Sequence, residues 1–347
     1  MSPVRLLSDN ETVSLPESLL SSVGFVGLDP WMFFTKKVYG FPLYRIVSKS
    51  NDEIDGWLAL VHVKHAIFGN YLATSPFGSY GGFGFFSLTV RNELLDSVRV
   101  LAKDLGVNHV NVRFDAGDKA ESQPDEWVSS PEYSTYLVDL SSGLDNLLRS
   151  FGSDHRNHVR KSMKKGFEIH FGHLELLDDV YEGLARSMHE IGSPYHKRMY
   201  LQTMAEMLGE KIEFAVMYSS RGEIAGTGVF IFHGGIATNL HANILREFRS
   251  DYAGEFLYWS MIERYCLMGF NVLDLGRSLN GSGNEMFKMK WKPLKRPLAY
   301  WYHLPAGGHL PELNQKNDKF QIANRIWKIL PSFVVRAVGP GLIRGIV

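Results

Sequence analysis

Two stretches of the chain repeat one pattern of a helix, a glycine and a strand. Residues 94–115 read LLDSVRVLAKDLGVNHVNVRFD, and residues 257–278, placed 163 positions later, read LYWSMIERYCLMGFNVLDLGRS. Each begins as an amphipathic helix, and Gly106 and Gly269 stand where a helix C-terminus favours glycine. An asparagine and an alternating apolar strand follow in both. This repetition predicts two copies of one α/β domain; the alternative is a chance similarity between two common units.

The repeat also predicts how the chain is divided. The first domain would cover residues 1–140 and the second residues 141–305, leaving a tail at 306–347. Within the second domain, the pattern predicts a basic helix near residues 154–165 and strands at 213–218, 224–232 and 235–242.

Composition narrows the class of protein. The 347 residues include 37 basic and 37 acidic ones, so no global field favours a nucleic-acid partner, and any contact with a polyanion must come from a local patch. Cys266 is the only cysteine, which excludes an internal disulfide framework and a cysteine-based metal site. The N-terminus has no apolar core typical of a signal peptide, and no apolar run is long enough to span a membrane. We therefore expect a cytoplasmic protein.

The most informative local feature is the stretch 273–291, LDLGRSLNGSGNEMFKMKW. A buried strand opens there into a glycine-rich polar loop, which is where α/β proteins commonly bind ligands. The aromatic and basic run 287–291 follows. The alternative is a surface turn before an edge strand. The polar side chains that the loop offers are Asp274, Arg277, Ser278, Asn280, Ser282 and Asn284.

The predicted basic helix carries a row of cations. Arg156, Arg160 and Lys164 follow one another at intervals of four residues and would share one face, with Asp154 as the N-cap. Like charges in that arrangement repel unless an anion compensates them. The row therefore predicts a contact for phosphates, on a nucleotide, a pyrophosphate carrier or an RNA. The alternative is a solvated basic face.

Other candidate side chains carry weaker signals. Asn239 and His241 alternate on one strand face, which indicates either a pocket or a surface. Tyr195 precedes a helix and could border a cleft. The pairs His62/His65 and His155/His158 lack acidic or cysteine partners at the spacing of zinc sites, so we predict no metal site.

The tail is basic and amphipathic. From Lys319 onward it contains no acidic residue, and apolar side chains interleave with its cations. This pattern favours adsorption to a membrane surface, and the alternative is a helix packed on the body of the protein. The cations are Lys319, Arg325, Lys328, Arg336 and Arg344.

The run LDLGRSLNGSGNEMFKMKW resembles the C-terminal signature of the FemAB-like proteins, which are tandem GNAT-fold transferases. Among these it is most similar to the FemAB-type proteins associated with exosortase and exopolysaccharide systems. Residues 69–82, 154–169 and 193–204 resemble three further segments of the family, so that the resemblance covers about residues 20–345.

The resemblance implies two tandem GNAT-like domains, each a mixed sheet flanked by helices, and an acyl-type transfer onto an amine. In the cell-wall members, the donor is an aminoacyl-tRNA and the acceptor a peptidoglycan precursor. Lys288 matches the family's FK lysine, which implies stabilisation of a developing oxyanion. Two departures stand out. Lys292 follows Trp291 where the family has glycine, and residues 249–254 depart from the glycine loop with which GNAT enzymes hold acyl-CoA.

Our hypothesis is an N-acyl or aminoacyl transferase that acts on a cell-envelope precursor, either a peptidoglycan peptide or an exopolysaccharide amino sugar. The acceptor could be a small molecule or be linked to a lipid, and the amine would attack the donor carbonyl directly. The donor is an aminoacyl-tRNA or an acyl-CoA, with no tightly bound cofactor. The alternative is a non-catalytic GNAT-fold protein that binds an envelope glycan or a lipid-linked carrier.

Roles follow from this hypothesis for the candidate residues. Lys288 and Asp274 would be catalytic, and Asp274 or Glu285 could act as the base. Phosphates would be held by the three cations of the basic helix. The substrate would be bound by Arg277, Ser278, Phe287, Tyr195, Asn239 and His241.

Overall fold

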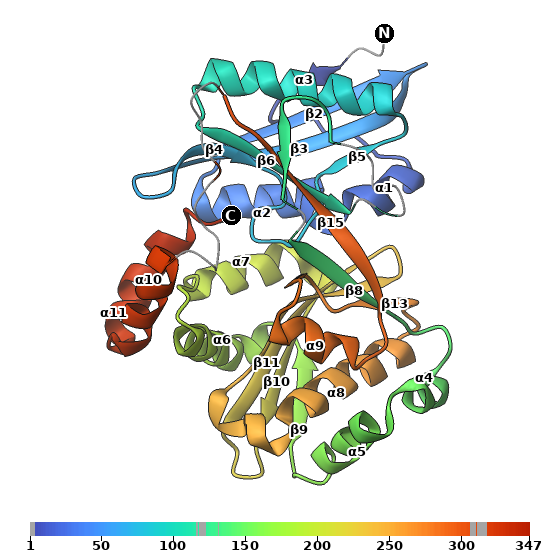
Figure 1. The fold of residues 1–347 in the computed structure, drawn as a ribbon, viewed down its shortest axis with the longest axis vertical. Coiled ribbons are helices and arrows are strands. Elements are labelled where there is room, and N and C mark those ends of the chain that lie inside the picture. Colours follow the sequence, from blue (N-terminus) through green and yellow to red (C-terminus); the bar gives the residue numbers. More distant parts are fainter. Residues whose placement is uncertain (1–3, 116, 118–122, 131, 306–309, 311–317) are drawn as a thin grey trace. The chain divides into compact units, whose positions relative to one another are not determined.

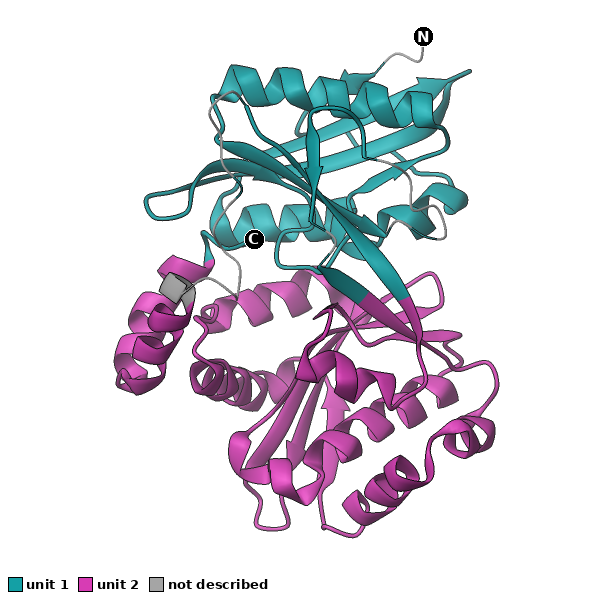
Figure 2. Cartoon of the chain, in the orientation of Figure 1, with its two compact units in different colours: residues 1–134, 296–312, 344–347 teal, residues 135–295, 313–343 magenta. Residues whose placement is uncertain are grey.

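The computed structural model describes residues 4–115, 117, 123–130, 132–305, 310 and 318–347. The chain forms two compact units (Figure 2). Unit 1 comprises Met1–Ser134, Arg296–Glu312 and Arg344–Val347, and unit 2 comprises Thr135–Lys295 and Leu313–Ile343.

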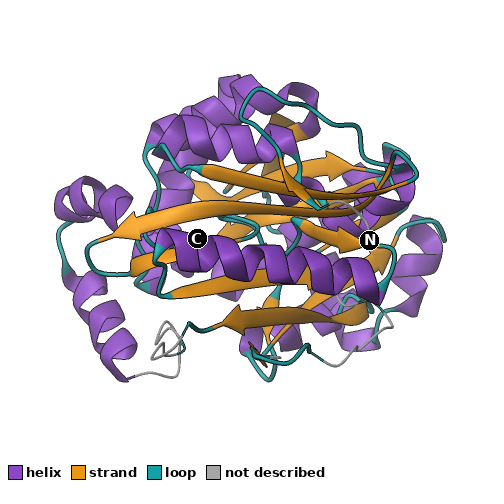
Figure 3. Ribbon diagram, turned by 90° about the horizontal axis from the view of Figure 1, so that it is seen from above, coloured by secondary structure: helices purple, strands orange, loops and turns teal. Residues whose placement is uncertain are grey.

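Unit 1 is a mixed sheet with helices on both faces (Figures 1 and 3). Its strands are ordered β1-β2-β3-β4-β6-β15, and β4 and β6 are the parallel pair. Its elements are β1 (Arg5–Leu6), α1 (Glu17–Val23), η1 (Phe25–Gly27), α2 (Asp29–Tyr39), β2 (Leu43–Ser50), β3 (Glu53–His65), β4 (Gly69–Ala73), β5 (Phe83–Phe85), α3 (Leu88–Leu105), β6 (His109–Asp115), β7 (Trp127–Ser129) and β15 (Leu294–His303).

Adjacent residues of β3 show how the two faces of this sheet are covered. Gly56 lies against Val90 and Leu94 of α3, and any side chain at position 56 would displace them. Trp57 points to the other face, where its indole N–H donates to the carbonyl oxygen of Gly27 at 3.0 Å. The alternation of side chains along a strand thus places α3 on one face and the N-terminal helices on the other.

Unit 2 has the same architecture (Figure 1). Its strands are ordered β9-β10-β11-β12-β13-β8, and β12 and β13 are the parallel pair. Its elements are β8 (Tyr133–Asp139), α4 (Leu144–Ser150), α5 (Ser153–Ser162), β9 (Glu168–Gly172), η2 (Leu174–Leu176), α6 (Leu177–Ile191), α7 (Arg198–Leu208), η3 (Gly209–Lys211), β10 (Ile212–Tyr218), β11 (Ile224–His233), β12 (Ile236–Ile244), η4 (Arg246–Asp251), α8 (Ala253–Leu267), β13 (Val272–Asp274), β14 (Ser278–Leu279), α9 (Gly283–Met289), α10 (Asp318–Ile329) and α11 (Ser332–Ile343).

The predicted repeat is confirmed in three dimensions. In each unit a helix, α3 or α8, connects the two parallel strands of the sheet. Gly106 ends α3 in the left-handed conformation, and Gly269 follows α8 with φ +84°. The strands β6 and β13 begin at His109 and Val272, which are equivalent positions of the repeat. The second of these crossovers belongs to the unit that carries most of the candidate residues.

The last strand of each sheet comes from the other half of the sequence. β8 follows unit 1 along the chain but pairs with β13 of unit 2, and β15 follows unit 2 but pairs with β6 of unit 1. The observed division therefore differs from boundaries at residues 140 and 305. Residues 135–140 belong to unit 2, and all but the first two residues of β15 belong to unit 1.

The structure differs from three local expectations drawn from the sequence. The run after the glycine loop is not an edge strand, because residues 283–289 form helix α9. Asp154 is not the N-cap of α5; Gly152 is, and no side chain caps that end. The tail forms α10 and α11, which pack on α6, so the alternative of a packed helix holds for this part of the chain.

Candidate active site

The parallel strands of unit 2 separate soon after they begin. β12 and β13 pair only over Ile236–Thr238 and Val272–Asp274, after which β12 continues to Ile244 paired with β11 but no longer with β13. The loop that leaves β13 approaches β12 closely. Gly276 has φ +74°, and a Cβ placed there would lie 2.8 Å from the carbonyl oxygen of Asn239. Only glycine satisfies both the backbone angle and the distance, so this residue brings the loop against the strand.

A β-bulge on β12 lies beside this separation. Val229 of β11 pairs with His241 and Phe230 pairs with Asn239, which leaves Leu240 as the extra residue on β12. Bulges bend a strand and redirect its side chains, and they are frequent beside active sites. The bulge therefore falls between the two residues of this strand that the sequence predicts to bind substrate.

Three predicted substrate-binding residues have buried polar atoms without a partner. Within the described part of the chain, no hydrogen bond is made by Asn239 Oδ1, His241 Nε2 or Ser278 Oγ. Buried polar groups are nearly always satisfied, and each exception needs a cause such as a ligand or ordered water. Burial also lowers the pKa of His241 to about 4, so its imidazole is neutral near pH 7.

Asp274 holds the loop rather than facing an open cavity. It is buried, and its Oδ1 accepts hydrogen bonds from the Thr135 hydroxyl at 2.5 Å and from the Gly276 backbone N–H at 2.8 Å. A carboxylate bound to the backbone two residues ahead fixes the local turn. Its position near Lys288 also supplies the negative charge that stabilises the lysine.

Lys288 lies buried on α9 with its ammonium group at the same loop. Its Nζ donates to the carbonyl oxygens of Gly276 at 2.8 Å and Arg277 at 2.9 Å, and it lies 5.5 Å from the centre of the Tyr136 ring. Burial lowers the pKa of Lys288 to about 8, and Asp274 partly opposes this shift. An ammonium group has three donors, so two hold the loop and one remains for a further acceptor.

The short helix α9 is capped at its N-terminus. The Ser282 hydroxyl accepts from the Glu285 backbone N–H at 3.2 Å, and the Glu285 carboxylate accepts from the Gly281 N–H. Lys295 also binds this carboxylate and, with the backbone contact, lowers the pKa of Glu285. Glu285 is therefore engaged in fixing the helix that carries Lys288.

Aromatic rings pack around α9. Phe287 and Trp291 both contact Tyr258 of α8, with ring centroids 5.0 and 5.8 Å apart. Tyr258 is buried, which raises its pKa to about 12, and its hydroxyl is hydrogen-bonded by the Asn239 side chain. The predicted residues Phe287 and Asn239 thus meet at one tyrosine.

Tyr195 lies against His241. Their ring centroids are 5.9 Å apart, and His196, which is 5.1 Å from Tyr195, stacks on Tyr200 at 3.7 Å. Burial keeps the pKa of His196 well below its usual value. These neutral aromatic side chains extend the group of candidate residues from β12 toward α7.

The three cations predicted on one helix face have different surroundings. Arg156 is partly buried and donates to the carbonyl oxygens of Arg149 and Phe151, where it caps the end of α4. Arg160 is exposed on α5, and Lys164 is exposed just beyond the helix, which ends at Ser162. Only two of the three predicted cations are therefore exposed, and their binding of phosphates stays a prediction.

A family model for the acetyltransferase (GNAT) domain matches residues 153–289, which include β12, β13 and α9. Unit 2 carries a GNAT acetyltransferase domain. This match confirms the predicted enzyme class, an acyltransferase of the GNAT superfamily. No curated protein sequence matches the chain.

Solved structures share the fold over most of the chain. "Crystal structure of FemX" matches with a TM-score of 0.62 and 16% identity, covering 82% of this chain and 93% of that one. L-PGS from Bacillus licheniformis matches with a TM-score of 0.53 and 13% identity over 89% and 92% of the two chains. A tandem GNAT protein from the clavulanic acid biosynthesis pathway matches with 0.54 and 12% over 88% and 100%. Together with the domain match, they confirm the predicted FemAB-like fold of two tandem GNAT-like domains.

Residues 249–254, which correspond in the sequence to the loop that holds acyl-CoA in GNAT enzymes, follow β12 and extend into the first turn of α8. Tyr252 takes the left-handed conformation, with φ +59°, although it has a side chain. Its ring lies 4.7 Å from that of His158, and Lys161 lies over it at 5.9 Å. Glu255, in the first turn of α8, is buried and lies 3.9 Å from His158 and 4.0 Å from Lys290. An acidic side chain thus occupies the helix N-terminus of the GNAT domain.

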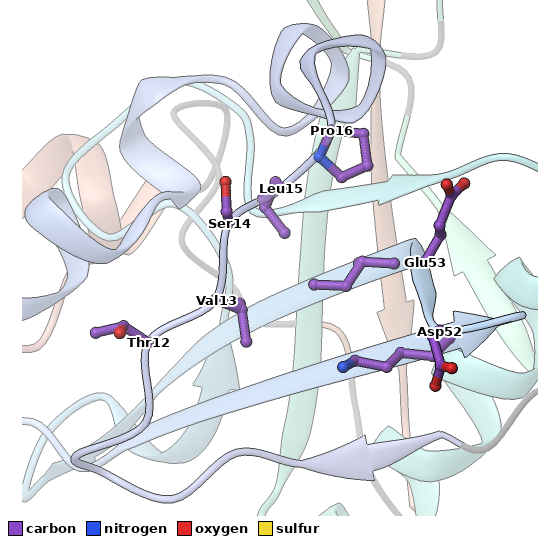
Figure 4. A pocket seen from close by; sticks show the side chains of 9 residues that line it. Thr12, Val13, Ser14, Leu15, Pro16, Asp52 and Glu53 are labelled. Atoms are coloured by element: carbon purple, nitrogen blue, oxygen red, sulfur yellow. The ribbon is translucent and has the colours of Figure 1, made fainter.

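Other features of the described residues lie apart from this site. A surface hollow of about 520 Å³ in unit 1 is bordered by Thr12–Pro16 and by the turn between β2 and β3 (Figure 4). It includes none of the predicted residues, so we place the candidate site in the GNAT domain. In the described parts of the chain, no three His, Cys, Asp or Glu residues group as metal ligands, and no helix is long and apolar enough to cross a membrane.

Sequence reasoning missed several residues of the site. Tyr136 and Thr135 come from β8, which is far from the loop in sequence and carries no local signal of contact with Lys288 or Asp274. Tyr258 lies in a helix that has apolar residues on nearly all sides, so the polar hydroxyl of this tyrosine does not stand out in the sequence. Its hydroxyl within the apolar stretch 256–259 of that helix was the only local signal that could have indicated it.

Proposed function

We propose that this protein transfers an acyl or aminoacyl group to an amine of a cell-envelope precursor, either a peptidoglycan peptide or an exopolysaccharide amino sugar. The GNAT domain supports the acyl transfer, and the resemblance of residues 273–291 to the FemAB-like signature supports a substrate of the cell envelope. The observation that carries the proposal is the buried ammonium group of Lys288, held at the separation of two parallel strands by two carbonyl oxygens.

The proposed reaction is a direct displacement. The acceptor amine attacks the donor carbonyl carbon and forms the C–N bond, and the carbonyl oxygen takes up the electron pair as an oxyanion. The remaining N–H of Lys288 would bind that oxyanion, which is worth a few kcal/mol in a dry, preorganised site. Collapse of the intermediate breaks the bond to the leaving oxygen or sulfur, which takes up the proton lost by the amine.

The acceptor would lie along β12. The amide oxygen of Asn239, the neutral imidazole of His241 and the hydroxyl of Ser278 offer buried acceptors for an amine and for hydroxyl or amide groups beside it. Asp274 contributes through the position and charge of Lys288. We therefore assign the two carboxylates a supporting role in place of the expected role as base, because Asp274 and Glu285 are both bound to backbone N–H groups.

We propose an aminoacyl-tRNA as the donor in preference to acyl-CoA. A pyrophosphate at the N-terminus of α8 would meet the buried carboxylate of Glu255 and the side chain of Tyr252. Beside this loop, α5 offers the exposed cations Arg160 and Lys161, which suit the phosphates of a nucleic acid. We place the reaction in the cytoplasm, where charged tRNA is available.

The test is a transfer assay followed by mass spectrometry. Charged tRNAs and acyl-CoAs are each offered with a peptidoglycan peptide precursor or an amino sugar, and the mass of the modified acceptor is measured. We expect acceptor-dependent release of deacylated tRNA. Replacing Lys288 by Ala should lower kcat/KM about 100-fold, while Lys103→Ala, an exposed lysine of α3, should leave it unchanged.

Each contrary result has a distinct meaning. Transfer from acyl-CoA alone would contradict the donor. An unchanged rate in Lys288→Ala would contradict the oxyanion assignment. Acceptor binding in calorimetry, with no transfer from any donor, would favour the non-catalytic alternative.

A further inference from the structure

The C-terminal helices of unit 2 leave a row of large apolar side chains in water. Ile322, Ile326, Ile329 and Phe333 are 54%, 52%, 81% and 73% exposed. Spacings of four and three residues place the three isoleucines on one side of α10, and Phe333 is exposed in the first turn of α11. We call these four residues the apolar stripe.

The opposite side of α10 is fixed to the body of unit 2. Trp327 is buried, and its backbone carbonyl oxygen lies 3.1 Å from His189 Nε2 of α6. Gly192, which ends α6, lies against Asn324 and Lys328. Because this packed side points toward α6, the apolar stripe faces away from it and stays uncovered by the described residues.

Elsewhere among the described residues, the most exposed aliphatic side chains are scattered. Val100 of α3, Leu267 of α8 and Ile67 of the β3–β4 turn are 62%, 75% and 68% exposed, but they belong to different elements. Single exposed apolar residues are normal, whereas a contiguous exposed row marks an interaction surface.

The charges around the stripe indicate which kind of partner could bind it. Residues 319–347 contain five Lys or Arg and no acidic residue. Arg336 is paired with Glu182, but Arg325 is exposed on α10 beside the stripe, and the exposed Lys328 lies at the border between the stripe and the packed side. A second copy docked on this surface would bring like charges together. A bilayer with anionic headgroups accepts both the apolar side chains and the cations.

We propose that the apolar stripe adsorbs to the surface of an anionic lipid bilayer, with α10 lying in the interface plane. The same helices contact the loop of Tyr195, because Gly339 of α11 lies against the Tyr195 backbone. Adsorption would therefore hold the candidate site of the GNAT domain beside the membrane. The membrane contact does not depend on the proposed reaction.

Vesicle flotation of the full chain tests this inference without donor or acceptor. We expect binding to phosphatidylcholine vesicles that contain phosphatidylglycerol, at least 10-fold weaker binding to phosphatidylcholine alone, and weakening by salt. The variant Ile326→Ser/Ile329→Ser/Phe333→Ser should lose at least 10-fold in binding. The matched control Ile67→Ser/Val100→Ser/Leu267→Ser removes three equally exposed apolar residues elsewhere and should bind like the wild type.

Circular dichroism first confirms that both triple variants fold. Arg325→Glu/Lys328→Glu should weaken binding to the anionic vesicles and leave the phosphatidylcholine result unchanged. Equal binding by wild type and stripe variant, or no binding by the wild type, would overturn the proposal. So would light scattering that shows a dimer which the stripe variant dissociates, because the stripe would then be an interface between copies.

Discussion

Lys288 combines burial with a charge that the proposed reaction needs. Its pKa falls from 10.5 to about 8 because burial disfavours the ammonium form, so the group is still mostly protonated at pH 7. The unfolded chain would keep this proton up to about pH 10, near the ordinary pKa of a lysine side chain. Between these two pH values the unfolded state binds more protons than the folded state, and linkage makes the free energy of unfolding rise with pH.

The reaction rate should fall as Lys288 loses its proton. We expect kcat to decrease tenfold per pH unit above about pH 8, because only the ammonium form stabilises the oxyanion. Lys288→Arg keeps the charge at all these pH values and should show no such decrease, even if its rate is lower. Steady-state rates from pH 6 to 10 measure both. A profile shared by the two enzymes would show that another group titrates.

The sequence indicated much of the candidate site at the level of single residues. Asn239, His241 and Ser278 were named from strand alternation and from the GRS motif, and all three have buried polar atoms without a partner among the described residues. Tyr136 and Tyr258 were missed because their roles depend on contacts with distant segments. The alternation of side chains within one strand is visible in the local sequence. The contact of an aromatic ring with a lysine on another element is not.

At the scale of elements, α9 depends on its first turn. The helix has seven residues, too few to be stable alone, so its N-cap has a large share in holding it. Residue patterns did not predict this helix, because Gly283 and Asn284 are poor helix formers and the stretch reads as a loop. Capping by Ser282 and the packing of Phe287 and Lys288 outweigh that low propensity.

Removing this cap should lower both stability and activity, whereas removing a similar cap far from the site should lower stability alone. Ser282→Ala should lower the free energy of unfolding by about 1 kcal/mol and also reduce kcat, because the helix positions Lys288. The control is Ser87→Ala, which removes the matching cap of α3, where Ser87 accepts from the Val90 N–H at 3.2 Å. It should cost similar stability and leave kcat unchanged. Urea unfolding and initial rates measure the two effects. An equal loss of kcat in both variants would show that stability alone controls the rate.

On the scale of the whole molecule, the sequence did not reveal that each sheet takes its last strand from the other half of the chain. We call this arrangement the exchange of strands. The repeat predicted two similar units, and both have the expected helix between parallel strands. The boundary at residue 140 nevertheless separates unit 1 from β15, because hydrophobic alternation shows that a strand forms without showing which sheet it joins. Pairing partners are chosen by register and by the apolar face of the neighbouring strand.

This exchange predicts that the first half of the chain does not fold alone. A fragment of residues 1–140 lacks β15, which pairs with β6 from Leu298↔Asp115 to His303↔Val110. It also lacks the C-terminal residues, where the Tyr71 hydroxyl donates to the Gly345 carbonyl oxygen at 2.8 Å. Without β15, the edge of β6 and the apolar core beneath Trp301 would be open to water. We expect the fragment to aggregate or to lack a cooperative thermal transition.

The control fragment restores only the missing strand. Residues 1–132 are joined to residues 294–303 through a Gly/Ser linker of about 12 residues, long enough to span the sheet edge. Circular dichroism and size-exclusion chromatography should then show a monomer with a cooperative transition, because β15 again covers β6 and buries Trp301. A monomeric 1–140 fragment that unfolds as cooperatively as the fused one would mean that β15 adds little to unit 1. The exchange of strands would then determine how the chain is connected without stabilising unit 1.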